Sequence, residues 1–148
     1  MSRNIADIDI SDLFLILLRN IRDDYSIKGR TKIQKIMFIL KNEFDLPHNF
    51  NYFLYTHGPY SITLQNEIDK LATFGLVNET AMRAQNYLTY KYSLTRQGQE
   101  VAESIIGDLS RPATETIARM TARARELDEQ RLEQIIETAY EYVPTSIP

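Results

Sequence analysis

A run of basic residues without any acid is the strongest electrostatic feature of the sequence. Positions 28 to 41 hold five cationic side chains in a chain whose net charge is -3. Such side chains, together with the free amides at a helix N-terminus, bind phosphate oxygens. The candidate phosphate contacts are Lys28, Arg30, Lys32 and Lys35. The alternative, which fits equally well, is that these residues form the solvated face of a helix whose other face is apolar.

A second set of polar residues lies on the outward face of a helix expected to begin after Ser61. Apolar residues recur at four- and three-residue steps across 64–71, so that stripe faces the core. Asn and Gln can hydrogen-bond adenine edges in the major groove, and Ser or Thr can contact phosphates or bases. Glu67 and Asp69 make this helix slightly acidic, which disfavours tight non-specific binding to DNA. The candidate contacts are Ser61, Thr63, Gln65, Asn66 and Lys70.

Residues 76–94 predict a two-stranded hairpin, because strand-forming residues flank a polar tip. Arginine is favoured in a narrow A·T minor groove. The candidate contacts are therefore Arg83, Gln85 and Asn86 at the tip, with Lys91 on the returning strand. A solvent-exposed loop explains the same residues equally well. Strand parity puts Tyr90 and Tyr92 on one face and Tyr87 on the other. Core packing or a protein interface explains these tyrosines at least as well as base stacking.

No motif in the sequence has the pattern of a catalytic or metal site. The chain has no cysteine, and its two histidines, His48 and His57, are not at a metal-ligand spacing. Asp23 and Asp24 are adjacent at a helix end and point about 100° apart, which suits solvent exposure better than acid–base catalysis. We therefore expect no enzymatic activity, no cofactor and no metal.

The composition is that of a folded, water-soluble domain. The 148 residues are 43% hydrophobic and 25% charged, with a pI near 5.4, so any binding of a polyanion must use a local patch. The longest strongly apolar run, 13–18, is far shorter than the roughly 20 residues that cross a bilayer. The N-terminus lacks a secretory pattern, so a cytoplasmic location is expected.

Helical periodicity and turn residues predict the order of the elements. The first helix is expected to be capped by Ser11, and the second to be capped by Thr31 and stopped by Pro47. A short strand is expected over 50–55, followed by a turn at Gly58-Pro59. After the helix at 61–74 and the hairpin, a helix capped by Thr95 ends at Gly107, and Gly98 weakens it. The expected fold is mainly α, of the α+β class.

The C-terminal region predicts two more helices with apolar stripes. One begins near Pro112, and the other is capped by Asp128 and closed by Pro144. The stripes either pack back on the first helix or meet the same helices of a second subunit. We therefore expect a domain over 1–108 and a helical extension over 109–148 that serves packing or dimerisation. Residues 101–148 carry a local charge of -4, which would face away from DNA.

Three helices followed by a hairpin is the order of a winged helix-turn-helix. The segment 71–77 resembles a recognition helix that runs into the first wing strand. The segment 92–98, Tyr-Ser-Leu-Thr-Arg-Gln-Gly, resembles the Tyr-x-Leu-Thr-x-x-Gly exit of many winged-helix regulators, including the PadR and MarR families.

A closer resemblance is carried by 29–40, by 55–61 and by Leu64. These segments are similar to the YwgA-like family of bacteria and archaea and, more distantly, to the Panacea domain found in antitoxins. Both have a Lys-x-x-Lys-type helix followed by a Gly-Pro-Tyr/Val turn, and His57 stands where Tyr is common. The likeness covers about 28–98, and 132–142 resembles the closing helix of the family. It implies a compact winged helix with a helical C-terminal cap, and it brings no catalytic residues.

Together these observations predict a cytoplasmic winged-helix protein that binds double-stranded DNA and regulates transcription. A homodimer formed through the C-terminal helices would direct two copies of the 61–75 helix toward adjacent major grooves. The alternative is a non-catalytic protein–protein interaction module of antitoxin or defence-associated type, which the acidic pI favours. The DNA hypothesis requires that the 61–75 helix be exposed, with its lysine-rich flank free of negative charge.

Overall fold

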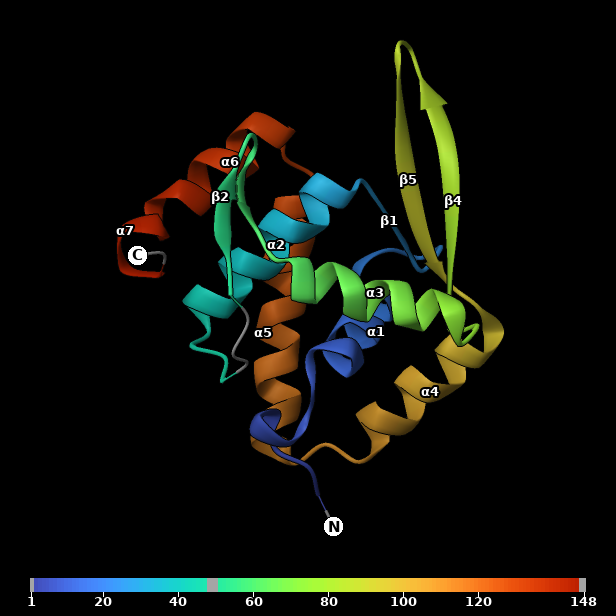
Figure 1. The fold of residues 1–148 in the computed structure, drawn as a ribbon. Helices are drawn as coiled ribbons and strands as arrows, with labels where there is room; N and C mark the ends of the chain where they lie inside the picture. Colours follow the sequence, from blue (N-terminus) through green and yellow to red (C-terminus); the bar gives the residue numbers. More distant parts are fainter. Residues whose placement is uncertain (1, 48–50, 147–148) are drawn as a thin grey trace.

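A computed structural model describes residues 2–47 and 51–146. The chain is mainly α-helical, as the element pattern predicted, and it has two small antiparallel sheets. A three-residue 3-10 turn, η1 (Ile5–Asp7), precedes the other elements, which are drawn in Figure 1. In chain order these are α1 (Ile10–Ile21), β1 (Ser26–Lys28), α2 (Arg30–Glu43), β2 (Phe53–Tyr55), β3 (Gly58–Tyr60), α3 (Ile62–Thr73), β4 (Val77–Ala84), β5 (Tyr87–Leu94), α4 (Arg96–Gly107), α5 (Arg111–Asp128), α6 (Leu132–Glu141) and α7 (Val143–Ser146).

The larger sheet has the strand order β1-β5-β4. Its long hairpin, β4–β5, projects away from the helical body (Figure 1). The edge strand β1 was not predicted, because three residues are too few to show an alternation. It pairs only with the second half of β5, from Ser26 opposite Ser93 to Lys28 opposite Lys91. Among residues 2–47 and 51–146, no other strand pairs with this edge of β5 beyond Lys91, toward the tip of the hairpin.

Helix α1 forms the centre of the core. Six consecutive residues from Leu13 to Leu18 are buried, so the helix is covered on every side there. Its N-cap lies two residues before the predicted one, because Asp9 rather than Ser11 accepts the hydrogen bond from the Asp12 amide. Ser11 instead donates a 2.9 Å hydrogen bond to Glu67 of α3.

Helix α2 is the second buried helix, which corrects the expected solvated face. All eight residues from Ile33 to Leu40 are buried, Gln34 and Lys35 included. The helix begins at Arg30 after Gly29, whose φ of 104° suits glycine, and no side chain caps it. The prediction that Thr31 caps this helix is therefore wrong. The helix ends at Glu43, before Pro47, as expected.

The connection from α2 to α3 contains a small hairpin. The expected single strand over 50–55 is β2, which starts at Phe53, whereas Phe50 lies outside the described residues. Gly58 and Pro59 lie in β3 rather than in a turn, because Tyr55 pairs with Gly58 and leaves Thr56 and His57 as the connection. This segment therefore forms two strands where the sequence predicted one.

Local capping sets the elements from α3 to α4 as predicted. The hydroxyl of Ser61 accepts from the Leu64 amide at the start of α3, and that of Thr95 accepts from the Gly98 amide at the start of α4. Gly98 has a packing reason to be glycine, because a Cβ there would collide with the carbonyl oxygen of Leu76. Strand β4 runs further than expected, so the tip of the hairpin is only Gln85 and Asn86.

The C-terminal helices pack back on the chain. Helix α5 lies against α1 and α2, and α6 lies against α2 and β3, so most of the two predicted apolar stripes is covered within one chain, whereas Leu132 stays exposed. Asp128 is the last residue of α5 and is buried, so it does not cap α6, which follows Arg131. Pro144 lies inside α7 rather than ending a helix. No helix among the described residues has the length and apolar character to span a membrane.

Candidate nucleic-acid interface

Helix α3 presents an open polar surface. Its apolar residues Leu64, Ile68 and Leu71 face the core, as the spacing predicted, and no element is drawn over the helix in Figure 1. The outward residues Thr63, Asn66 and Lys70 are exposed, and Gln65 is half-buried. Four of the five residues proposed on this helix therefore reach its accessible surface.

Ser61, the fifth of these residues, does not reach the surface. It is fully buried, and its hydroxyl is used to cap α3. Its backbone is held by Gln34 of α2, which donates to the Ser61 carbonyl at 2.9 Å and accepts from the Ser61 amide at 2.8 Å. Ser61 therefore positions α3, and the prediction that Ser61 contacts DNA directly is wrong.

Acidic neighbours offset the charge on α3. Lys70 forms an ion pair with Glu67 at 3.2 Å, and Gln65 donates to Asp69 at 3.0 Å. The helix alone therefore carries no net attraction for phosphate, so any such attraction has to come from the elements beside it.

A polar network joins α2, α3 and the long hairpin. Arg30 donates to the hydroxyl of Tyr92 at 2.7 Å and forms an ion pair with Glu79 at 3.0 Å. Tyr92 donates to the same Glu79 oxygen at 2.6 Å, and Gln65 of α3 reaches the Tyr92 hydroxyl at 3.5 Å. The guanidinium of Arg30 also lies 3.8 Å from the ring centroid of Tyr90. The hairpin is thereby anchored to the beginning of α2.

The network shifts the pKa values of its members. Burial raises the pKa of Tyr92 to about 12, and the hydrogen bond to Glu79 adds to the rise. For Glu79, burial opposes ionisation, but the hydrogen bonds from Tyr92 and Arg30 outweigh it and lower the pKa. At neutral pH the network therefore contains a neutral phenol between a guanidinium and a carboxylate. Sequence analysis missed Glu79, which lies 49 residues from Arg30.

A groove of about 770 Å³ runs along the free edge of β5, between the start of α2 and the long hairpin. It contains four cationic side chains and two tyrosines, and none of its lining residues is acidic. Lys28 is exposed there and has no ion-pair partner in the described part of the chain. The lining residues are Arg22, Lys28, Gly29, Arg30, Thr31, Lys32, His57, Tyr87, Leu88, Thr89, Tyr90 and Leu132. Arg22 and His57 were not predicted, because they reach the groove only through the packing of the chain.

The remaining two residues of the predicted basic cluster are engaged internally. Lys32 forms a 3.1 Å ion pair with the buried Asp128 of α5, which also lies 3.6 Å from Arg22. Lys35 is 2% exposed and lies at the floor of a separate cavity. The positive charge that Lys32 brings to the groove is therefore partly neutralised. The expectation that Lys35 contacts a phosphate backbone is wrong, because its side chain is inside the protein.

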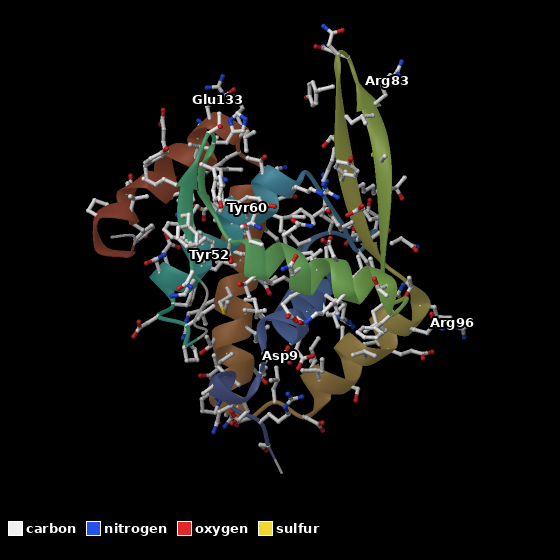
Figure 2. All side chains as sticks on the ribbon, viewed as in Figure 1. Asp9, Tyr52, Tyr60, Arg83, Arg96 and Glu133 are labelled. Atoms are coloured by element: carbon white, nitrogen blue, oxygen red, sulfur yellow. The ribbon has the colours of Figure 1, made fainter. Side chains whose placement is uncertain are left out.

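The hairpin separates the other proposed contacts. Figure 2 places Arg83 near the tip, where it is exposed together with Gln85 and Asn86. Strand register puts Arg83 on the same sheet face as Glu79, whereas Lys91 lies on the opposite face and pairs with Asp24 at 3.8 Å. Lys91 is therefore apart from the groove. The structure describes no group of three His, Asp or Glu side chains that could hold a metal, and His48 lies outside the described residues.

Comparison with known proteins supports the resemblance found in the sequence. No family model matches the chain. A curated relative, the uncharacterized protein YwgA of Bacillus subtilis strain 168, is 34% identical over 82 residues. The match covers 55% of this chain and 49% of the relative, so the chain spans about half the length of the relative that it matches. The predicted resemblance to a YwgA-like protein is therefore confirmed as homology over that segment.

Proposed function

We propose that this chain is a winged-helix protein that binds duplex DNA and acts in transcriptional regulation. The sheet order β1-β5-β4, with α2 and α3 before the long hairpin, is the arrangement expected of that fold. Helix α3 would enter the major groove, and the hairpin would serve as the wing beside the minor groove.

The observation that carries this proposal is the groove without acidic lining residues, together with the exposed polar face of α3. Lys28 and the exposed part of the Arg30 side chain offer positive charge in the groove. Tyr87 and Tyr90 offer rings against which a sugar or base can pack. The DNA-binding surface would consist of Lys28, Arg30, Lys32, Thr63, Gln65, Asn66, Lys70, Arg83, Gln85 and Asn86.

The salt dependence of duplex binding tests this proposal. Fluorescence anisotropy with a labelled duplex of mixed sequence should give an affinity that falls steeply as salt rises, because phosphate contacts release counterions. Lys28→Gln should lower the slope of log affinity against log salt by about 1. Lys41→Gln removes the same charge near the far end of α2 and should leave the slope unchanged. An affinity that is absent, or that does not respond to salt, would contradict the proposal.

The wing has its own matched pair of variants. Arg83→Glu reverses an exposed charge near the tip of the hairpin, and Lys91→Glu reverses one on the opposite sheet face. Arg83→Glu should weaken DNA binding more than Lys91→Glu if the tip inserts beside the minor groove. Equal effects would show that only net charge matters and would remove the tip from the interface.

Dimerisation belongs to the same proposal. Because the inner stripes of α5 and α6 are covered, a dimer through the C-terminal helices has to use their outer surface. That surface includes the exposed Leu132 and Tyr140 of α6. Sedimentation at micromolar concentration should give a mass of twice 17.2 kDa, and a monomer would contradict binding to two half-sites.

A protein–protein interaction module is the second candidate, and exposed apolar residues favour it. All three residues of β2, Phe53, Leu54 and Tyr55, are about half exposed, as is Ile62 at the start of α3. Such a group is more typical of a protein-binding surface than of a surface for phosphates. This candidate predicts a partner whose binding is insensitive to salt and lost in Phe53→Ser, with Lys28→Gln as the neutral control.

A further inference from the structure

Lys35 is a buried cation without a counter-ion. It lies in the middle of α2 and is 2% exposed. Its ammonium group has no hydrogen bond or ion pair within the described residues, and the closest aromatic ring, that of Tyr60, has its centroid 5.9 Å away. Nζ keeps some contact with solvent through the cavity, but an ammonium with so little exposure loses most of its hydration, which an opposite charge or a set of acceptors would compensate for. A bound anion would therefore stabilise the ammonium of Lys35 in this position.

The stem of Lys35 is held in place by its neighbours. A Cβ placed on Gly58 would lie 3.4 Å from Lys35 Cε, 3.4 Å from Tyr140 and 3.8 Å from Ile136. Gly58 has a φ of 99°, which an L side chain rarely adopts, so the close approach of hairpin to lysine is set by the backbone. The β2–β3 hairpin and α6 thus cover the methylene stem and leave the ammonium to face the cavity.

The cavity into which Lys35 points has the size and composition of a small-molecule site. Its volume is about 320 Å³, at the lower end of typical ligand pockets. Tyr55 and Tyr60 meet edge to face at 5.4 Å, and Figure 2 shows Tyr60 beside α2. None of the described lining residues is acidic, so Lys35 has no competing partner there. The lining residues are Thr31, Lys35, Tyr55, Thr56, His57, Tyr60 and Ile62.

These walls determine the class of ligand. One buried ammonium suits a single carboxylate, whereas a phosphate dianion would need further donors to compensate for its second charge. The rings of Tyr55 and Tyr60 and the side chain of Ile62 suit an apolar body rather than a second charged group. The hydroxyl of Thr31 is a further donor on the lining of the cavity.

We propose that this cavity binds a small monocarboxylic acid with an apolar body. The carboxylate pairs with Lys35 Nζ, and the body packs against Tyr55, Tyr60 and Ile62. The proposal does not depend on DNA binding, because it rests only on the buried ammonium and the walls around it.

The charge state of Lys35 gives the proposal a pH signature. Burial lowers the pKa of Lys35 to about 8, so the group is mostly protonated at pH 7. A bound carboxylate favours the ammonium and raises that pKa. Above pH 8 the free protein therefore has to take up a proton on binding, and the affinity for a carboxylate falls by up to about tenfold per pH unit.

Calorimetric titration of the full chain tests this site. Hexanoate and cyclohexanecarboxylate are the probes, and their primary amides are neutral analogues of the same shape. The acids should bind at pH 7 and weaken above pH 8, and the amides should bind about 10- to 100-fold more weakly, the range expected for loss of a charge-assisted hydrogen bond. Equal binding of acid and amide would overturn the proposal, as would tighter binding of inorganic phosphate.

Lys35→Met provides the matched variant. Methionine keeps an unbranched stem and removes the charge, so the acids should lose affinity by the same 10- to 100-fold. Lys41→Met, on the same helix outside the cavity, should bind the acids like the parent protein. Unchanged binding in Lys35→Met would overturn the proposal. If that variant fails to fold, the comparison of acid with amide and the pH profile of the parent protein still decide it.

Discussion

The side-chain amide of Gln34 and the backbone of Ser61 are joined by two hydrogen bonds, one in each direction. The Ser61 amide donates to Gln34 Oε1 at 2.8 Å, and Gln34 Nε2 donates to the Ser61 carbonyl at 2.9 Å. Both groups are fully buried. This pairing mimics one step of a β-ladder and fixes the start of α3 on α2, independently of the hairpin inserted between the two helices.

We expect Gln34→Met to destabilise the protein, because it leaves the buried amide of Ser61 without a partner, whereas the Ser61 carbonyl keeps its 3.2 Å hydrogen bond from the Gln65 amide. One unsatisfied buried group costs about 1–3 kcal/mol, so the free energy of unfolding should fall by about that amount. Urea denaturation measures the change. Gln97→Met at an exposed position of α4 is the control and should stay within about 0.5 kcal/mol. Equal stability of the two variants would contradict this role of Gln34.

Asp128→Asn should have opposite effects on stability and on DNA binding. The buried carboxylate pairs with Lys32 at 3.1 Å and with Arg22 at 3.6 Å, and its loss should lower the free energy of unfolding by about 1.5–3 kcal/mol. The same change releases two cations that line the groove, so the affinity for duplex DNA should rise and its salt slope should steepen. Asp108→Asn, at an exposed site, makes the same change in net charge. If it raises affinity equally, the effect is not specific to the groove.

Gly98→Ala should destabilise the protein although alanine is the better helix former. In an open helix the exchange would stabilise by up to about 1 kcal/mol. At Gly98 the added Cβ collides with the carbonyl of Leu76, so the root of the long hairpin has to move away from α4. We expect a loss of at least about 1–3 kcal/mol, as for other overpacked sites, in thermal or urea unfolding. Gly107→Ala at the end of the same helix meets no atom within 4 Å and should be neutral or stabilising.

The stability of the protein should depend on pH through Lys35. Its pKa is lowered from 10.5 to about 8 by burial, so between these values the unfolded chain binds more protons than the folded one. Stability contributed by this group therefore rises as the pH rises from 8 to 10.5, by up to about 3 kcal/mol. Urea unfolding of the parent protein and of Lys35→Met across this range isolates the effect. A constant difference between the two proteins would contradict it.

Local signals in the sequence predicted the local features well. Ser61 and Thr95 cap their helices as expected, because an N-cap depends on residues three positions apart. The inward stripe of α3 and the long hairpin followed from spacing and composition alone. The start of α1 was predicted two residues late, because Asp9 and Ser11 are both good capping residues and only packing decides between them.

Long-range contacts determine what the sequence could not predict. The basic cluster was expected to act as one surface, yet Glu79 pairs with Arg30 from 49 residues away and Asp128 with Lys32 from 96 residues away. Lys35 occupies a helical position that reads as polar, but α6 and the β2–β3 hairpin cover it. Neither an ion pair nor a covering element can be recognised from the periodicity of the sequence around the residue that it affects.

Thr31 and His57 line both the groove beside β5 and the cavity above Lys35. The groove and the cavity thus share two of their lining residues. A ligand in the groove or in the cavity would therefore restrict the rotamers of Thr31 and His57 that are available to the other site. A small molecule bound over Lys35 and a nucleic acid lying along β5 would therefore touch the same two residues, and each could change the affinity for the other.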